Sequence, residues 1–149
     1  MHRGLRSALL LAFLTVPAVS RAQKASSSPD EAAVRQVVTT YLHGLKFNDV
    51  PSLEKAFWPD AKLFFVGTGG HLGQLSQAEW YKGFATSAGK EEEGDLKIVS
   101  VEVTRDIANV KVVEEYPTSR YTDYIALIRF DGAWRIVNKI YTAEKKPKK

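Results

Sequence analysis

A row of phenol and amine side chains near the carboxyl end is the part of this chain best suited to chemistry. The dipeptide Asp131-Gly132 lies between two β-rich runs, which is the strongest short-range signal for a two-residue hairpin. Such a loop would place Tyr124 opposite Lys139 and Thr122 opposite Tyr141 on one face. A desolvated lysine beside tyrosines could accept a proton or bind an anionic ligand group. Alternatively, the lysine stem packs on a tyrosine and its ammonium reaches solvent.

Other titratable residues are weaker candidates for a site. Strand alternation places Asp123 on the face opposite Lys139, His43 lies on the exposed side of a predicted helix, and His71 lies beside a glycine turn. The chain has no cysteine, which excludes thiol catalysis, disulfides and cysteine-ligated zinc. It also lacks metal-ligand spacing, a serine elbow, a phosphate loop and a dinucleotide fingerprint. We therefore expect no metal site and no cofactor, and no catalytic residue is identified.

Three helices are predicted in the amino-terminal half. Ser28-Pro29-Asp30-Glu31 combines an N-cap serine, a proline at the first helical position and a glutamate three residues after the cap, and an apolar stripe through Tyr41 follows at helical spacing. A second, short helix follows Asn48-Asp49 and ends at Pro59. Ser76 and Glu79 form another capping box and start a third helix.

Strands fill the remainder of the predicted domain. Residues 63–67 and 71–75 form a short pair around Thr68-Gly69-Gly70, residues 96–104 and 107–115 form a longer pair, and the Asp131-Gly132 hairpin follows. The charged run 89–95 is predicted to be a mobile loop. Helices gathered on one face of a curved antiparallel sheet make an α+β domain.

The two termini are predicted to lie outside this domain. Arg3 and Arg6 precede an apolar run, and Ser20-Arg21-Ala22 resembles a cleavage site, which predicts a signal peptide over residues 1–22 and a secreted or periplasmic protein. Residues 23–28 would be a linker, 29–143 the domain and 144–149 a basic, disordered tail. We expect no stable membrane anchor after cleavage, because the apolar run is short.

The surplus of positive charge belongs to these terminal segments. The predicted signal peptide and the basic tail hold seven of the 21 Lys and Arg residues, which leaves 14 basic against 17 acidic residues. The predicted domain is therefore mildly acidic, and a nucleic-acid partner is not indicated.

Three segments together resemble the nuclear transport factor 2-like superfamily. They are Tyr41 to Asp49, Phe57-Trp58-Pro59-Asp60-Ala61, and the hairpin Phe130-Asp131-Gly132 with residues 134–139. Within the superfamily the chain resembles the putative lumazine-binding branch, close to polyketide-cyclase-like and ketosteroid-isomerase-like domains. The resemblance covers residues 30–142 and implies a cone, in which a sheet of about six antiparallel strands wraps around three helices.

The resemblance also implies a ligand pocket inside the cone. Its expected ligand-binding residues are Tyr41, Phe57, Phe65, Trp80, Phe84, Tyr124, Lys139 and Tyr141. Tyr41 falls where ketosteroid isomerases keep an oxyanion-stabilising tyrosine, but Phe65 and Ala126 occupy the positions of their two aspartates. Without those carboxylates, that proton-shuttling mechanism lacks its base and half of its oxyanion hole.

The face away from the pocket is expected to mediate dimerisation, as superfamily members commonly do. Its apolar residues would be Ile125, Leu127, Trp134 and Ile136. Three functions stay open: an exported small-molecule-binding protein without catalysis, a lyase, isomerase or cyclase using Tyr41 and Lys139 on a small cyclic or aromatic substrate, and a non-catalytic dimerisation scaffold.

Overall fold

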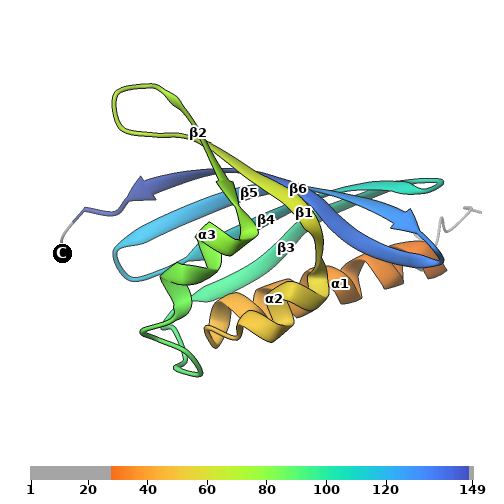
Figure 1. Cartoon of the computed structure of the whole chain (residues 1–149), viewed down its shortest axis with the longest axis horizontal. Coiled ribbons are helices and arrows are strands. Elements are labelled where there is room, and N and C mark those ends of the chain that lie inside the picture. The colour runs from red at the N-terminus through yellow and green to blue at the C-terminus, as the bar shows by residue number, and fades with distance from the viewer. Residues whose placement is uncertain (1–27, 148–149) are drawn as a thin grey trace, which may run out of the picture.

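The structure, a computed structural model, describes residues 28–147 of the 149-residue chain. Its helices are α1 (Pro29–Lys46), α2 (Val50–Ala56), α3 (Gln77–Tyr81) and the 3-10 turn η1 (Lys82–Phe84). Its strands are β1 (Phe57–Val66), β2 (Leu72–Ser76), β3 (Asp95–Thr104), β4 (Ile107–Glu115), β5 (Ser119–Phe130) and β6 (Ala133–Lys145). Figure 1 shows the helices gathered on one side of a curved sheet, which confirms the predicted α+β cone.

The sheet has the strand order β2-β1-β6-β5-β4-β3. Six strands confirm the prediction, but the sheet is mixed rather than purely antiparallel, because β1 runs parallel to β6. Parallel strands need a long connection between them, and here all the elements from β2 to β5 lie between β1 and β6 in the sequence. Residues 58–61 interrupt the β1–β6 ladder, and this stretch contains Pro59, which has no backbone N–H to donate.

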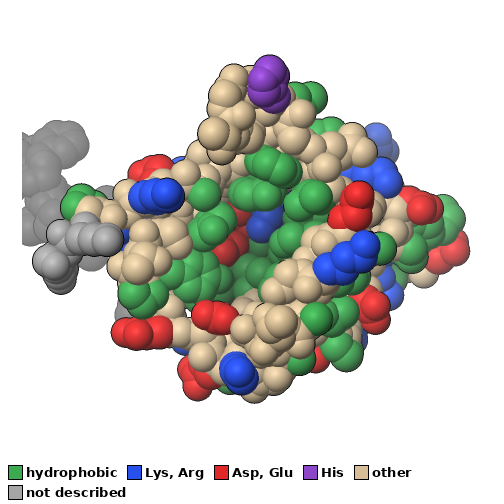
Figure 2. Space-filling model, turned by 60° about the vertical axis from the view of Figure 1, so that its left-hand side comes forward, with side chains coloured by type: hydrophobic (Ala, Val, Ile, Leu, Met, Phe, Trp, Pro, Cys, Tyr) green, Lys and Arg blue, Asp and Glu red, His purple; other side chains and the backbone are tan. Residues whose placement is uncertain are grey.

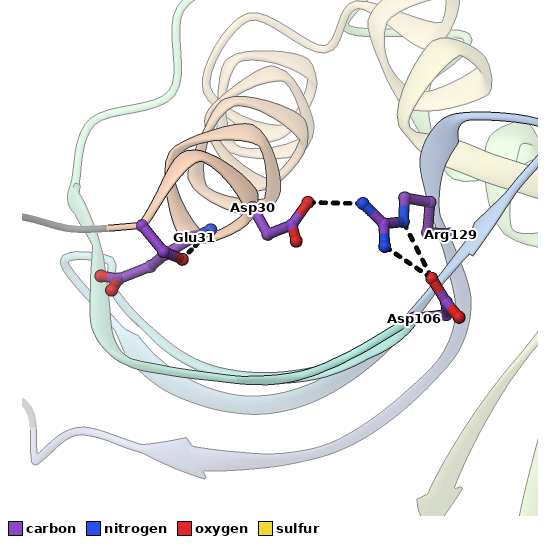
Figure 3. A network of polar contacts seen from close by, with 5 residues as sticks. Asp30, Glu31, Asp106 and Arg129 are labelled. Carbon is purple, nitrogen blue, oxygen red and sulfur yellow. Dashed lines mark hydrogen bonds and ion pairs between the residues drawn. The ribbon is translucent and has the colours of Figure 1, made fainter.

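Helix α1 begins as the capping pattern predicts. The Ser28 hydroxyl accepts a hydrogen bond from the backbone N–H of Glu31 at 3.1 Å. Figure 3 shows how Asp30, in the first turn of α1, is joined to the sheet. Arg129 Nη1 donates to Asp30 Oδ1 at 2.8 Å, and Arg129 Nη2 donates to Asp106 Oδ1 at 2.7 Å. One guanidinium therefore joins the start of α1, the β3–β4 turn and the end of β5.

The packing of α1 against α2 depends on a glycine. A Cβ added at Gly44 would lie 2.7 Å from Leu53 Cγ, and Leu53 is fully buried. The close approach of the two helices therefore requires a residue without a side chain at this position.

The terminal hairpin turns at Asp131-Gly132 as predicted, with φ values of 48° and 75°. Phe130 pairs with Ala133 and Leu127 pairs with Ile136, but Ala126 then pairs with Asn138. Val137 is thus an extra residue in β6, a β-bulge that shifts the register by one. Beyond it, Ile125 faces Lys139 and Asp123 faces Tyr141, so the predicted pairs Tyr124/Lys139 and Thr122/Tyr141 are wrong.

This bulge changes which residues face the helices. Because side chains alternate along a strand, a shift of one residue exchanges the faces of β6 beyond Val137. Lys139 therefore shares the inner face with Trp134 and Ile136. Ile125, Leu127, Trp134 and Ile136 are core residues, each at most 4% exposed, and not the outer dimer face that the sequence predicted. Conversely, Tyr124 lies on the outer face and is 57% exposed.

The carboxyl end of the sheet extends past the predicted domain boundary at 143. Strand β6 continues to Lys145, and Lys146 is anchored because its Nζ donates to the Tyr116 carbonyl at 2.6 Å and pairs with Glu115 at 2.9 Å. The predicted signal peptide and nearly all of the linker lie outside the described residues. No helix within residues 28–147 has the length and apolarity needed to cross a bilayer.

Candidate functional site

A pocket of about 570 Å³ opens between the helices and the concave side of the sheet. It is lined from the α1–α2 junction, from α3 and η1, from the loop before β3, from the β4–β5 connection and from β6. Figure 2 shows the hollow, with hydrophobic side chains around it and basic and acidic side chains at its depth. Its aromatic lining residues are Trp80, Phe84, Tyr116, Tyr121 and Tyr141, and its ionisable ones include Glu92, Glu93, Glu114 and Lys139.

The aromatic wall continues a cluster of rings from the core. Tyr41 packs edge-on against Phe57 with ring centroids 5.6 Å apart, and Phe57 lies 5.7 Å from Trp80. Trp80 in turn meets Phe84 at 5.1 Å. The two inner rings are fully buried, so they support the two outer ones that line the pocket.

Four polar side chains meet at the floor of the pocket. Lys139 Nζ lies 2.7 Å from Asp123 Oδ2 and donates to the Tyr41 hydroxyl at 2.6 Å. The Tyr41 hydroxyl donates to Asp123 Oδ2 at 2.5 Å. Glu114 completes the cluster, with Oε1 3.9 Å from Lys139 Nζ. We call Tyr41, Glu114, Asp123 and Lys139 the floor cluster; all four are buried, and Glu114 and Lys139 line the pocket.

Two carboxyl groups, those of Asp123 and Glu114, lie within hydrogen-bonding distance of the single Tyr41 hydroxyl. The Tyr41 hydroxyl has a single hydrogen, which its shortest contact directs to Asp123. The same hydroxyl is also in donor geometry to Glu114 Oε1 at 3.1 Å, and its one hydrogen cannot serve both carboxyl oxygens at once. Tyr116 donates to the other oxygen, Oε2, at 3.2 Å. A neutral Glu114 satisfies every one of these contacts.

The electrostatic environment agrees with this assignment. Burial raises the pKa of Glu114 to about 8; the Lys139 charge opposes the shift, and the Asp123 charge adds to it. Burial alone would lower the pKa of Lys139, but its acidic neighbours, Asp123 foremost, outweigh burial and hold that pKa above its ordinary value. Burial also raises the pKa of Tyr41 well above the usual value for a phenol. At neutral pH the floor cluster therefore holds one ion pair, one carboxylic acid and one phenol.

The loop between η1 and β3, predicted to be mobile, is pinned over the pocket edge. Lys46 Nζ donates to the carbonyls of Glu92 at 2.6 Å and Gly94 at 3.0 Å. Asn48 Nδ2 donates to the Lys90 carbonyl and to Glu92 Oε1, both at 2.9 Å. These bonds fix the end of α1 to the loop, so Glu92 and Glu93 form one edge of the pocket.

The structure brings half of the sequence-predicted site residues to the pocket wall: Trp80, Phe84, Lys139 and Tyr141. Tyr41 and Phe57 lie behind this wall in the core. Phe65 packs on the far side of Tyr141 at 5.2 Å and does not line the pocket. Tyr124 lies on the opposite face of the sheet. Its predicted place in the pocket assumed a regular hairpin, without the bulge at Val137.

Sequence reasoning missed Asp123 and Glu114 as members of the site. Asp123 was assigned to the outer face, yet it is fully buried against Tyr41 and Lys139. Glu114 is the last residue but one of β4, whose residues Val110, Val112 and Val113 are buried, and a carboxylate continuing an apolar run was an available signal. Within residues 28–147 no cluster of three or more His, Asp or Glu side chains is placed to hold a metal ion.

The sequence is similar to a known family and to a curated protein. The family described as "Putative lumazine-binding" matches residues 29–142. A curated protein, "Aldolase FrzH" of Cladobotryum sp, is 28% identical over 102 residues, which cover 62% of this chain and 80% of that protein.

Solved structures share the same fold. An NTF2-like protein from Silicibacter pomeroyi superimposes with a TM-score of 0.67 at 29% identity, covering 76% of this chain and 94% of that one. Another from Shewanella baltica gives a TM-score of 0.73 at 20% identity, covering 81% and 100%. The CaMKII hub of S. rosetta gives 0.61 at 16% identity, covering 80% and 100%.

Proposed function

The chain belongs to the putative lumazine-binding family of the nuclear transport factor 2-like superfamily, and from that membership we propose that it binds a small ring-shaped molecule in the pocket above the floor cluster. The observation that carries the proposal is the pocket itself. Its volume of about 570 Å³ falls in the range of small-molecule sites, and its lining combines aromatic rings with convergent polar groups.

The pocket walls suit a flat ring. Trp80 and Tyr141 contribute aromatic faces to the lining, and aromatic rings stack on one another with a gain beyond burial alone. Lys139 at the floor supplies the polar group that would orient the ring. A ligand would therefore be held by stacking at its faces and by hydrogen bonding at one edge.

Binding is tested first by native mass spectrometry of the purified protein and then by titration with lumazine, followed by its fluorescence. Tyr141→Ala should weaken binding at least about tenfold, because it removes one aromatic wall. Tyr124→Ala is the matched control, since this tyrosine lies on the adjacent strand but faces outward. Equal affinities of the two variants would contradict the proposed location.

A second candidate is a lyase that cleaves a carbon–carbon bond in a small hydroxycarbonyl compound. It is favoured by the neutral Glu114 carboxyl beside the Lys139 ammonium, a proton donor and a positive charge facing one cavity, and by the similarity to a protein named an aldolase. Tyr41 is fully buried and could act only through Lys139. Turnover that disappears in Glu114→Gln while ligand affinity is kept would favour the lyase over a binding protein.

The third candidate function is dimerisation, through residues other than those that the sequence predicted. The outer face of the sheet exposes apolar side chains that a second copy of this chain could cover: Val99, Ile107, Tyr124, Ile128, Phe130 and Ile140. We propose that two sheets pack through this face. Sedimentation should give a dimer that Ile140→Asp dissociates, and a monomeric wild-type protein would contradict this.

Export remains a proposal as well. It rests on Arg3, Arg6 and the apolar run that follows them. Amino-terminal sequencing of protein collected from outside the cytoplasm should begin at Gln23, and an intact Met1 in that fraction would contradict cleavage.

A further inference from the structure

The ligand chemistry can be narrowed by counting the donors of the floor cluster. An ammonium group has three hydrogens. Asp123 Oδ2 and the Tyr41 hydroxyl take two of those of Lys139, at 2.7 and 2.6 Å. Glu114 Oε1 lies at 3.9 Å, beyond hydrogen-bonding distance. No oxygen or nitrogen atom of the described residues takes the third donor. Lys139 Nζ also lies 5.3 and 4.9 Å from the ring centroids of Trp80 and Tyr141, so this donor remains at the aromatic wall of the pocket.

The charge of the site restricts what this donor can accept. The Lys139 charge is already balanced by Asp123, and neutral Glu114 and Tyr41 leave the floor cluster with no net charge. The edge of the pocket carries Glu92 and Glu93. An anionic ligand would therefore meet no uncompensated positive charge at the floor and two carboxylates at the entrance, which favours a neutral ligand over an anionic one.

The same contacts prevent Lys139 from acting as a nucleophile. An imine forms only when a neutral amine attacks a carbonyl carbon and water leaves, and the amine must first lose a proton. The ion pair with Asp123 holds that proton on Nζ. The two hydrogen bonds also fix the nitrogen at the floor.

We propose that the pocket selects a neutral ring compound bearing a carbonyl, whose oxygen accepts a hydrogen bond from Lys139 without forming an imine. This inference rests on the proposed small-molecule binding and specifies its ligand class. Stacking on the aromatic wall places the ring, and the single free donor selects an acceptor at its edge.

The test compares three pteridine probes at slightly acidic pH. Lumazine carries two carbonyls, 2,4-diaminopteridine replaces them with amino groups, and lumazine-6-carboxylate adds a negative charge. The diamine lacks the carbonyl oxygen that would accept a hydrogen bond from charged Lys139, and the charge of the carboxylate is opposed by Glu92 and Glu93. Lumazine should therefore bind at least about tenfold more tightly than either of the others. Equal binding of lumazine and the diamine, or tighter binding of the carboxylate, overturns the inference alone. Absence of binding by all three overturns the proposed function together with it.

Variants assign the selectivity to named residues. Lys139→Met should abolish the preference for lumazine over the diamine. If that variant fails to fold, Lys139→Met with Asp123→Asn removes both charges and tests the same preference. Glu93→Gln should improve binding of the carboxylate, whereas Glu102→Gln, an exposed residue of β3 outside the pocket, should not. A preference that survives loss of Lys139 overturns the assignment.

Reductive trapping tests the absence of an imine independently of affinity. The protein is incubated with benzaldehyde and cyanoborohydride, and modified lysines are mapped by peptide mass spectrometry. Exposed Lys55 and Lys82 should be alkylated and Lys139 should not. Alkylation of Lys139 at a comparable rate overturns the proposal of noncovalent recognition.

Discussion

Lys139 Nζ and Asp123 Oδ2 form an ion pair 2.7 Å apart although 16 positions separate them in the hairpin, and both side chains are almost completely buried. Tyr41 on α1 contacts both partners, so the pair joins the sheet to the helix that covers it. The ligand pocket and the stability of the domain therefore depend on the same charges.

Removing one partner of this ion pair should lower the unfolding free energy more than removing both partners together. Lys139→Met leaves a buried carboxylate without its partner, as Asp123→Asn leaves a buried ammonium, and each should cost about 3–5 kcal/mol of unfolding free energy. The double variant should lose less than the sum of the two losses. Urea denaturation measures all three, and additive losses would mean that the two groups are not coupled.

The protonated Glu114 predicts that stability declines as pH rises. Its pKa is raised from 4.5 to about 8 by folding, so the folded state holds a proton that the unfolded state releases. The stabilisation is complete below the unfolded pKa and is lost as pH rises to about 8, at up to about 1.4 kcal/mol per pH unit. Glu114→Gln should flatten this part of the stability profile measured by urea denaturation between those pH values. A wild-type profile that is already flat would contradict a neutral Glu114.

The contact between α1 and α2 predicts a large effect of a single methyl group. Gly44→Ala places a Cβ against Leu53 and should lower the unfolding free energy by about 1–3 kcal/mol, because the buried leucine cannot move aside freely. Gly83→Ala is the matched control, since nothing lies within 4 Å of an added Cβ there. Similar thermal midpoints for the two variants would refute the close packing.

The loop over the pocket should loosen when its anchor is removed. Asn48 has a φ of 50°, so Asn48→Gly keeps the backbone conformation while it removes both side-chain hydrogen bonds to the loop. Amide hydrogen exchange should then accelerate in residues 85–94. Exchange in β4 provides the internal reference, and unchanged protection of the loop would show that Lys46 alone holds it.

Much of the fold could be predicted because local signals agree with the tertiary structure. Ser28 and Ser76 cap helices as their sequences suggest, and Asp131-Gly132 turns the hairpin at the expected place. The bulge at Val137 could not be predicted, since no local signal distinguishes this valine from its neighbours in a regular strand. That one residue reversed the assignment of Asp123, Tyr124 and the proposed dimer face. Glu114 follows a buried apolar run, which suggests burial, but its place at the pocket depends on contact with Tyr41 from a distant segment.

The extra residue in β6 divides the strand into two parts with separate roles. Before Val137, the inward side chains Trp134 and Ile136 only fill the interior, whereas after it Lys139 and Tyr141 meet whatever enters from outside. If the pocket binds a ligand as proposed, mutations in the second part would alter which molecule is accepted while the first keeps the scaffold intact. Relatives could thus diversify in specificity along one strand without having to rebuild the domain.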